Sequence, residues 1–303
     1  PQWFISMESH KLRSKALKAI DDTTFYPSKG KERLKSMIET RPDWCVSRQR
    51  VWGVPLPIFI NKETKEILVD DEVIENIASI YEKEGSDCWF SDDPQRFLGK
   101  KYKAEDYEKL SDIVEVWFDS GSTHSFVLEK RDELKWPASM YLEGSDQHRG
   151  WFHSSLLESC GTRGRAPFES ILSHGFVVDG KGLKMSKSLG NVIAPDEILK
   201  KYGADILRIW VASSNYAEDL RIDYSILDQH ADSYRKIRNT FRYLLGNIND
   251  NFEDINLDIL EVKELPELEQ LMLHKIFVLN DKFKQYFSNY DFHNLYKELL
   301  NFC

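Results

Sequence analysis

The sequence lacks an apolar run of membrane-spanning length, and its cysteines form no cluster. The longest apolar stretch, residues 51–60, is broken by a glycine and two prolines and falls far short of the roughly 20 residues that a bilayer requires. The four cysteines are scattered, with no Cys-x-x-Cys pair, so we expect neither a zinc site nor another bound metal. A disulfide would need an oxidising compartment that nothing else indicates, so we expect reduced cysteines, no membrane partner and a cytoplasmic protein.

A net positive charge is also lacking, because 50 acidic residues outnumber 41 basic ones. The formal net charge of −9 excludes a surface coated in positive charge for nonspecific nucleic-acid binding, although a local basic face is still allowed. Internal repeats and low-complexity segments are missing too. The chain starts without an initiating Met and without a signal peptide, so we expect an internal fragment of a longer protein.

What is present is a change of pattern along the chain. Early helices are expected over residues 7–20, 31–40, 71–84 and 146–160, and strands over residues 56–60, 67–70, 140–142 and 171–178. Later helices are expected over residues 195–201, 204–212, 228–247, 267–287 and 292–301. The sequence therefore predicts a parallel α/β domain over residues 1–213, with a small insertion around 56–110, followed by an all-α region over 214–303.

Residues 179–191 form a loop rich in glycine, lysine and serine. Lysine ammonium groups supply point charge to a polyphosphate and stabilise the charge that builds on its leaving oxygens. This makes Lys184 and Lys187 candidate catalytic residues. By composition alone, a solvated surface loop is the more common explanation for such a segment.

A second candidate site follows the strand expected at residues 140–142. Gly144 between a strand and a helix allows close backbone approach, and open α/β sheets bind ligands at the carboxyl ends of their strands. Asp146 would accept hydrogen bonds from ligand hydroxyl groups there. Alternatively, Asp146 only caps the following helix, and Gln147 is a solvated residue of its first turn.

The string Lys184-Met185-Ser186-Lys187-Ser188 matches the signature loop of class I aminoacyl-tRNA synthetases, and its chance occurrence is on the order of one in ten thousand. The resemblance covers essentially the whole chain. It implies the C-terminal half of a Rossmann-like nucleotide-binding catalytic domain, then a helical stem and the start of an anticodon-binding bundle. It implies that Lys187 meets the ATP pyrophosphate and Asp146 the ribose, while Glu143, Gly144 and Gln147 bind the adenylate and His174 lies near adenine.

Residues 43–55 resemble a block shared by the isoleucine, valine and leucine enzymes, and residues 116–121 and 143–152 resemble the bacterial or organellar isoleucine members. This resemblance implies L-isoleucine, ATP with Mg²⁺ and tRNA(Ile) as partners, and a monomer. Trp52 and Trp117 match the tryptophans that line the isoleucine pocket, although core packing is the usual role of tryptophan. Valine or leucine ligation and a non-catalytic nucleotide- or tRNA-binding module remain the alternatives.

Two family features are missing from the sequence. It contains no His-x-Gly-His motif, which supplies the other half of the ATP site in the family, and no visible editing domain. We therefore expect the isolated chain to be unable to form the adenylate. A basic helical face, consisting of Arg235, Lys236, Arg238 and Arg242, could contact tRNA phosphates or could simply be solvated.

Overall fold

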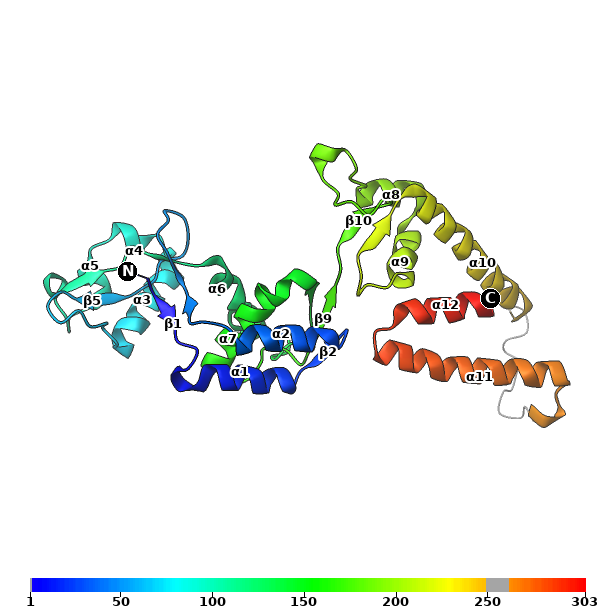
Figure 1. Ribbon diagram of the computed structural model, residues 1–303, viewed down its shortest axis with the longest axis horizontal. Coiled ribbons are helices and arrows are strands. Elements are labelled where there is room, and N and C mark those ends of the chain that lie inside the picture. Colours follow the sequence, from blue (N-terminus) through cyan, green and yellow to red (C-terminus); the bar gives the residue numbers. More distant parts are fainter. Residues whose placement is uncertain (1, 249–261) are drawn as a thin grey trace. The chain divides into compact units, whose positions relative to one another are not determined.

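The computed structural model describes residues 2–248 and 262–303 (Figure 1). It divides into two compact units. Unit 1 comprises Pro1–Leu142 and Asp146–Leu172, and unit 2 comprises Glu143–Ser145 and Ser173–Cys303. The division falls within two neighbouring strands, β8 (Tyr141–Gly144) and β9 (Ser170–His174). The boundary expected at residues 213–214 lies inside unit 2, and as a division of function it stays a prediction.

The remaining elements of unit 1 are β1 (Phe4–Ile5), α1 (Leu12–Asp21), β2 (Thr24–Tyr26), α2 (Lys29–Glu39), β3 (Trp44–Cys45), β4 (Ser47–Arg48), β5 (Phe59–Asn61), α3 (Asp71–Glu84), α4 (Cys88–Ser91), α5 (Pro94–Leu98), β6 (Tyr107–Lys109), β7 (Ile113–Val114), α6 (Val116–Gly121) and α7 (Trp151–Thr162). Unit 2 continues with β10 (Val177–Asp179), α8 (Pro195–Tyr202), α9 (Ala204–Ser213), β11 (Leu220–Ile222), α10 (Tyr224–Ile248), α11 (Glu267–Ser288) and α12 (Phe292–Phe302). A mixed α/β region followed by helices confirms the predicted fold class.

The central sheet has the order β2-β9-β8, and β2 runs parallel to β9 with Phe25 opposite Ile171. In unit 2, β10 and β11 also pair in parallel. The helices α1, α2 and α7 lie side by side in unit 1 (Figure 1). They bury a shared core whose members include Leu12, Leu34 and Leu156: α1 and α2 each contribute one apolar face, whereas α7 is buried on nearly all sides.

The helix expected at residues 71–84 is observed over the same residues. Asp70 caps α3 by accepting hydrogen bonds from the N–H groups of Glu72 and Val73, and Gly85 ends it at a φ of +83°. This helix buries Val73 and Ile77 in a separate small core of the insertion, which also contains the fully buried Trp89. Residues 56–110 thus have a hydrophobic core of their own.

Two predicted strands are wrong in detail. The strand expected at 67–70 is reduced to a bridge between Ile67 and Ile60, where the Leu68 N–H donates a hydrogen bond to the Phe59 carbonyl, while the other edge of β5 pairs with the distant β6. The strand expected at 171–178 is two strands, β9 and β10, separated at Gly175. A Cβ at Gly175 would lie 2.2 Å from the carbonyl oxygen of Glu218, so only glycine fits where the chain passes this backbone.

The helical part of unit 2 follows the predicted pattern. Helices α8 to α12 begin and end within a few residues of the expected positions, and the described part of α10 starts four residues earlier, at Tyr224. A third core, with Ile206, Trp210 and Leu227 among its members, joins α8, α9, β11 and the start of α10. Among the described residues, the longer helices are too polar to cross a lipid bilayer.

Candidate functional site

Helix α6, which carries Trp117, is fixed at its N-terminus by a buried carboxylate. Glu115 is only 6% exposed. It accepts a hydrogen bond from Trp44 Nε1 at 2.8 Å and caps α6 by accepting one from the Trp117 N–H at 3.3 Å. The Arg48 guanidinium lies 3.6 Å from the same carboxylate. Because these polar groups satisfy one another, the start of α6 has a defined position.

The Trp117 indole packs on the glycine that precedes α7. A Cβ at Gly150 would lie 2.8 Å from Cη2 of Trp117 and 2.6 Å from Oε1 of Gln147, so only glycine fits without displacement. Gln147 Oε1 accepts a hydrogen bond from the Trp151 N–H at 3.0 Å, and its Nε2 donates to Asp146 at 2.8 Å. The structure therefore brings the predicted pocket residue Trp117 together with two predicted adenylate residues.

Helix α7 begins later than predicted. Residues 145–148 form a 3₁₀ turn, and the N-cap of α7 is Gly150. Asp146 consequently does not cap α7, and it lies exposed on the turn. The alternative role of Asp146, as the cap of the following helix, is therefore not the one that the structure shows.

The far end of α6 approaches α7 equally closely. A Cβ at Gly121 would lie 2.2 Å from Oε1 of Glu158, and Trp151 Nε1 donates a hydrogen bond to the Ser120 carbonyl at 3.0 Å. Burial, with a smaller effect of Asp119, raises the pKa of Glu158 to about 9, so this carboxyl is neutral at pH 7. Sequence reasoning missed both Gly121 and Glu158.

Trp52, the second predicted pocket residue, is 92% exposed. Its segment is nevertheless joined to that of Trp117, because β4 pairs antiparallel with β7, the strand just before α6. At Gly53, whose φ is +147°, a Cβ would lie 2.4 Å from Cδ1 of Ile113, so the loop after β4 rests on β7. The pocket role of Trp52 stays a prediction.

The remaining predicted adenylate residues end two neighbouring strands. Glu143 and Gly144 end β8, and the Gly144 N–H donates a hydrogen bond to the Glu143 carboxylate at 2.6 Å. His174 ends β9, and its Nδ1 donates to the Gly175 carbonyl at 2.7 Å. Ligand-binding groups of open α/β sheets commonly stand at such strand ends.

The predicted lysine loop follows β10. Met185 is half-buried and packs against the core of unit 2, whereas Lys184 and Lys187 are exposed. A 3₁₀ turn at Lys187–Leu189 is capped by Ser186, whose Oγ accepts a hydrogen bond from the Leu189 N–H at 3.3 Å. The apolar residue thus anchors the loop, and the two ammonium groups face solvent.

The predicted basic face of α10 is only partly available for binding. Arg235 forms an ion pair with Asp232, and Lys236 Nζ donates a hydrogen bond to the Leu300 carbonyl of α12 at 2.9 Å. Arg238 and Arg242 are exposed. We infer that Lys236 helps to hold α12, which leaves the two arginines as the better candidates for a phosphate contact.

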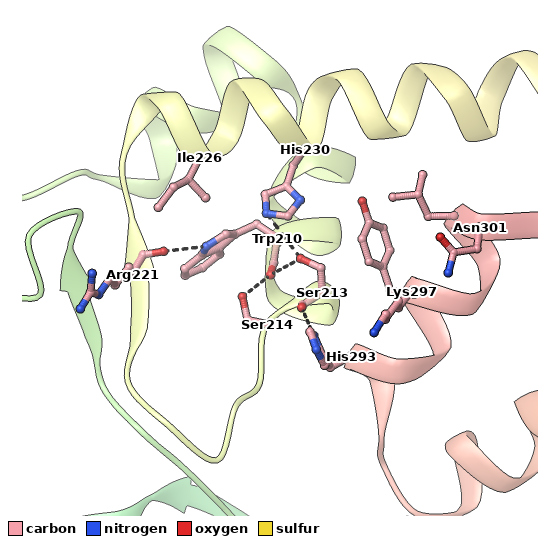
Figure 2. Close-up of a pocket in the computed structure, with 11 residues that line it drawn as sticks. Trp210, Ser213, Ser214, Arg221, Ile226, His230, His293, Lys297 and Asn301 are labelled. Carbon is pink, nitrogen blue, oxygen red and sulfur yellow. Dashed lines mark hydrogen bonds between the residues drawn. The ribbon is translucent and has the colours of Figure 1, made fainter. Parts of the chain in front are cut away.

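A cavity of about 300 Å³ lies where α12 meets α9 and α10 within unit 2 (Figure 2). His293 Nδ1 donates a hydrogen bond to the Ser213 carbonyl, which connects α12 to the end of α9. The Tyr296 hydroxyl is buried, without a hydrogen-bond partner among the described residues. Burial lowers the pKa of His230. The lining contains none of the residues predicted to bind ATP or the amino acid, and sequence patterns gave no signal for it.

Cysteine and metal chemistry is limited in the described residues. All four cysteines are free thiols. In residues 2–248 and 262–303, no three His, Cys, Asp or Glu side chains are grouped so that they could hold a metal ion. The buried His153, whose pKa burial lowers to about 3, is neutral at pH 7.

The amino-acid sequence matches a family model and several known proteins. The family model described as tRNA synthetases class I (I, L, M and V) matches residues 1–223. The chain is 84% identical to the isoleucine–tRNA ligase of Pelagibacter ubique (strain HTCC1062) over 303 residues, which are all of this chain and 34% of that protein. The chain therefore spans about a third of the length of the curated relatives that it matches.

Solved structures share the fold at lower identity. Mycobacterium tuberculosis methionyl-tRNA synthetase in complex with methionyl-adenylate has a TM-score of 0.65 and 18% identity, covering 99% of this chain and 51% of that chain. The ternary LeuRS–tRNA–LeuAMS complex of Agrobacterium radiobacter K84 has a TM-score of 0.62 and 20% identity, covering 86% of this chain and 35% of that chain. These likenesses concern the fold and confirm the α/β-then-helical architecture.

Proposed function

This chain belongs to the class I tRNA synthetase family (I, L, M and V), and on that premise we propose that the complete protein activates L-isoleucine with ATP and transfers it to tRNA(Ile). The observation that carries the proposal is the packing of Trp117 on Gly150 beside Gln147, which joins a candidate amino-acid pocket to a candidate adenylate site. The 84% identical isoleucine–tRNA ligase supports isoleucine as the substrate.

In the proposed activation step, a carboxylate oxygen of isoleucine attacks the α-phosphorus of ATP, and pyrophosphate leaves. The ammonium groups of Lys184 and Lys187 stabilise the negative charge that develops on the pyrophosphate. Asp146 accepts hydrogen bonds from the ribose hydroxyls, Glu143, Gly144 and Gln147 bind the adenylate, and His174 lies near adenine. No general base is required, because the attacking carboxylate is already ionised.

Further partners follow from the same proposal. Mg²⁺ would arrive on the ATP phosphates, and no step here depends on it. Arg238 and Arg242 would contact tRNA phosphates. The protein would act as a cytoplasmic monomer, and the 303-residue chain alone would not form the adenylate.

Isoleucine-dependent ATP–pyrophosphate exchange by the complete polypeptide tests the proposal. We expect isoleucine to give the highest kcat/KM, above valine and leucine. Lys187→Ala should lower kcat by about 100-fold, which is the usual effect of removing one donor that stabilises charge in the transition state. Lys200→Ala, on the exposed face of α8, is the control and should leave kcat unchanged. A higher kcat/KM with valine or leucine would reassign the substrate, and no exchange with any of them would favour a non-catalytic module.

A further inference from the structure

The lysine loop is closed at its base by two side chains outside its signature string, Asp179 and Asn191. One carboxylate oxygen of Asp179 accepts hydrogen bonds from the N–H groups of Lys181 at 3.0 Å and Leu183 at 2.8 Å. Its other oxygen accepts a hydrogen bond from Asn191 Nδ2 at 2.9 Å. A single carboxylate therefore ties the first turn of the loop to its last residue.

The Asn191 side-chain amide also forms hydrogen bonds to the backbone in the middle of the loop. Its Oδ1 accepts a hydrogen bond from the Ser186 N–H at 3.0 Å, and its Nδ2 donates to the Lys184 carbonyl at 3.3 Å. These two backbone groups flank Met185, whose side chain packs on the core of unit 2. The backbone between Lys184 and Lys187 is thus held from one side by an amide and from the other by an apolar anchor.

We propose that Asp179 and Asn191 are positioning residues, which together hold Lys184 and Lys187 where the ammonium groups can stabilise the leaving pyrophosphate. The inference rests on the proposed function and deepens it. Lysine side chains have many rotamers, so a fixed backbone is the main restraint on where their charges lie. Charge stabilisation in turn depends on groups that are in place before the reaction.

The character of the Asp179 carboxylate agrees with this role. The hydrogen bond from Asn191, followed by that from the Leu183 N–H, lowers the pKa of Asp179 below its ordinary value. At neutral pH the group is a carboxylate, so it acts only as an acceptor. Hydrogen bonds to a charged acceptor are the stronger class, which suits a pair that is only half-buried.

Two single variants of the complete polypeptide disrupt the pair without changing its size. Asn191→Asp places a second carboxylate against Asp179. Asp179→Asn places an amide NH₂ against either the Asn191 NH₂ or the N–H groups of Lys181 and Leu183, whichever way the new amide is turned. We expect each to lower the kcat of isoleucine-dependent ATP–pyrophosphate exchange by about 10- to 100-fold, with the KM for isoleucine unchanged.

The swapped double variant, Asp179→Asn with Asn191→Asp, restores a matched donor and acceptor. The new amide at 179 keeps an oxygen for the N–H groups of Lys181 and Leu183, and it donates to the new carboxylate at 191, which still accepts from Ser186. The hydrogen bond to the Lys184 carbonyl is replaced by a contact between two acceptor oxygens, so the recovery is partial. We therefore expect the double variant to recover kcat to within about tenfold of the wild type. A loss equal to the product of the two single losses overturns the proposal.

A second measurement tests the Asp179–Asn191 contact without relying on the proposed activity. Trypsin cleavage after Lys184 and Lys187, followed by mass spectrometry on the native complete protein without substrates, reports the order of the loop directly. We expect faster cleavage in both single variants and near wild-type cleavage in the double variant. Equal cleavage rates in all four proteins would overturn the proposal even if the exchange assay assigned a different amino acid.

Discussion

Around Trp117 the contacts are mostly steric, whereas around Lys187 they are mostly hydrogen bonds. The Trp117 ring would lie within 3 Å of a Cβ at Gly150, and the Glu158 carboxyl would lie 2.2 Å from one at Gly121. In the lysine loop, a Cβ at Gly190 would meet nothing within 4 Å, although at the base of the loop one at Gly180 would lie 2.1 Å from the Asp223 carboxylate. The tip of the lysine loop is therefore much more open than the contact between α6 and α7.

This difference fits the task proposed for each part. Discrimination between aliphatic side chains rests on the shape of an apolar pocket, and shape is kept only where neighbouring atoms are tightly packed. Stabilising the charge of a leaving pyrophosphate needs ammonium groups at defined positions but not a filled interior. Polar contacts such as those of Asp179 and Asn191 meet that need in a loop whose residues 181–184 are all exposed.

The largest effect is expected from Gly150→Ala in the complete polypeptide. The new methyl group would displace Trp117 or Gln147, and a shift of about 1 Å at a reacting site costs about 100-fold in rate. We expect the kcat/KM for isoleucine-dependent exchange to fall by at least about that factor.

Gly161→Ala is the matched control, because it lies on the same helix α7 and its Cβ would be 3.8 Å from Cδ1 of Leu12, an ordinary contact. Its exchange activity should equal that of the wild type, and its stability should rise by about 0.5–1 kcal/mol. If Gly150→Ala retained activity within threefold of the wild type, the steric description of this part would be wrong.

Local signals predicted much of the fold. The α3 helix was predicted to the residue because its signals are local: apolar residues recur at helical spacing, and Gly85 follows directly after the last turn. The strand predicted at 67–70 is only a bridge to β5, and the ladder that β5 forms is with β6, more than forty residues away, a pairing that nothing in the local pattern indicates. The close approach of Gly175 to the backbone of Glu218, at the break between β9 and β10, joins positions that are equally distant in sequence.

The candidate site shows the same limit. The string from Lys184 to Ser188 identifies the loop, yet its sequence does not reveal that Asp179 and Asn191 are hydrogen-bonded across it. Nothing in the sequence singles out Gly180, yet a Cβ there would lie 2.1 Å from the Asp223 carboxylate. Trp117 was predicted from its motif, but its contact with Gly150 joins two motifs that are 33 positions apart and needed the structure.

A smaller effect, on the free energy of unfolding, is expected from Glu158→Gln in the packed part of the candidate site, where α6 meets α7. The folded protein keeps the Glu158 proton up to a pKa of about 9, whereas an unfolded chain releases it near 4.5. The folded state therefore binds more protons between these values, and the free energy of unfolding falls as the pH rises through that window. Glutamine does not titrate, so the variant should gain a few kcal/mol over the wild type at pH 8.5 and less than about 1 kcal/mol at pH 5.

Unfolding temperatures of the complete polypeptide at pH 5 and pH 8.5 measure this difference. Glu129→Gln is the control. The hydrogen bond from Arg163 lowers the pKa of Glu129, so the stability that Glu129 contributes is already present at a pH above the ordinary pKa of glutamate. Its difference from the wild type should be the same at both pH values. A Glu158→Gln variant that behaved in the same way would show that the packed part does not bury a neutral acid.

The smallest effect is expected from Gly190→Ala in the lysine loop. Gly190 has a φ of +65°, which costs an L-residue about 1 kcal/mol, but an added methyl group would enter open space. We expect the exchange kcat to fall about fivefold, since this cost shifts the loop away from its observed conformation, while the unfolding temperature stays the same. Asparagine tolerates the left-handed region, so Gly190→Asn should regain most of the activity. A loss as large as that of Gly150→Ala would mean that the loop is as tightly packed in the working enzyme as the α6–α7 pair, and the contrast between steric and hydrogen-bonded parts would then fail.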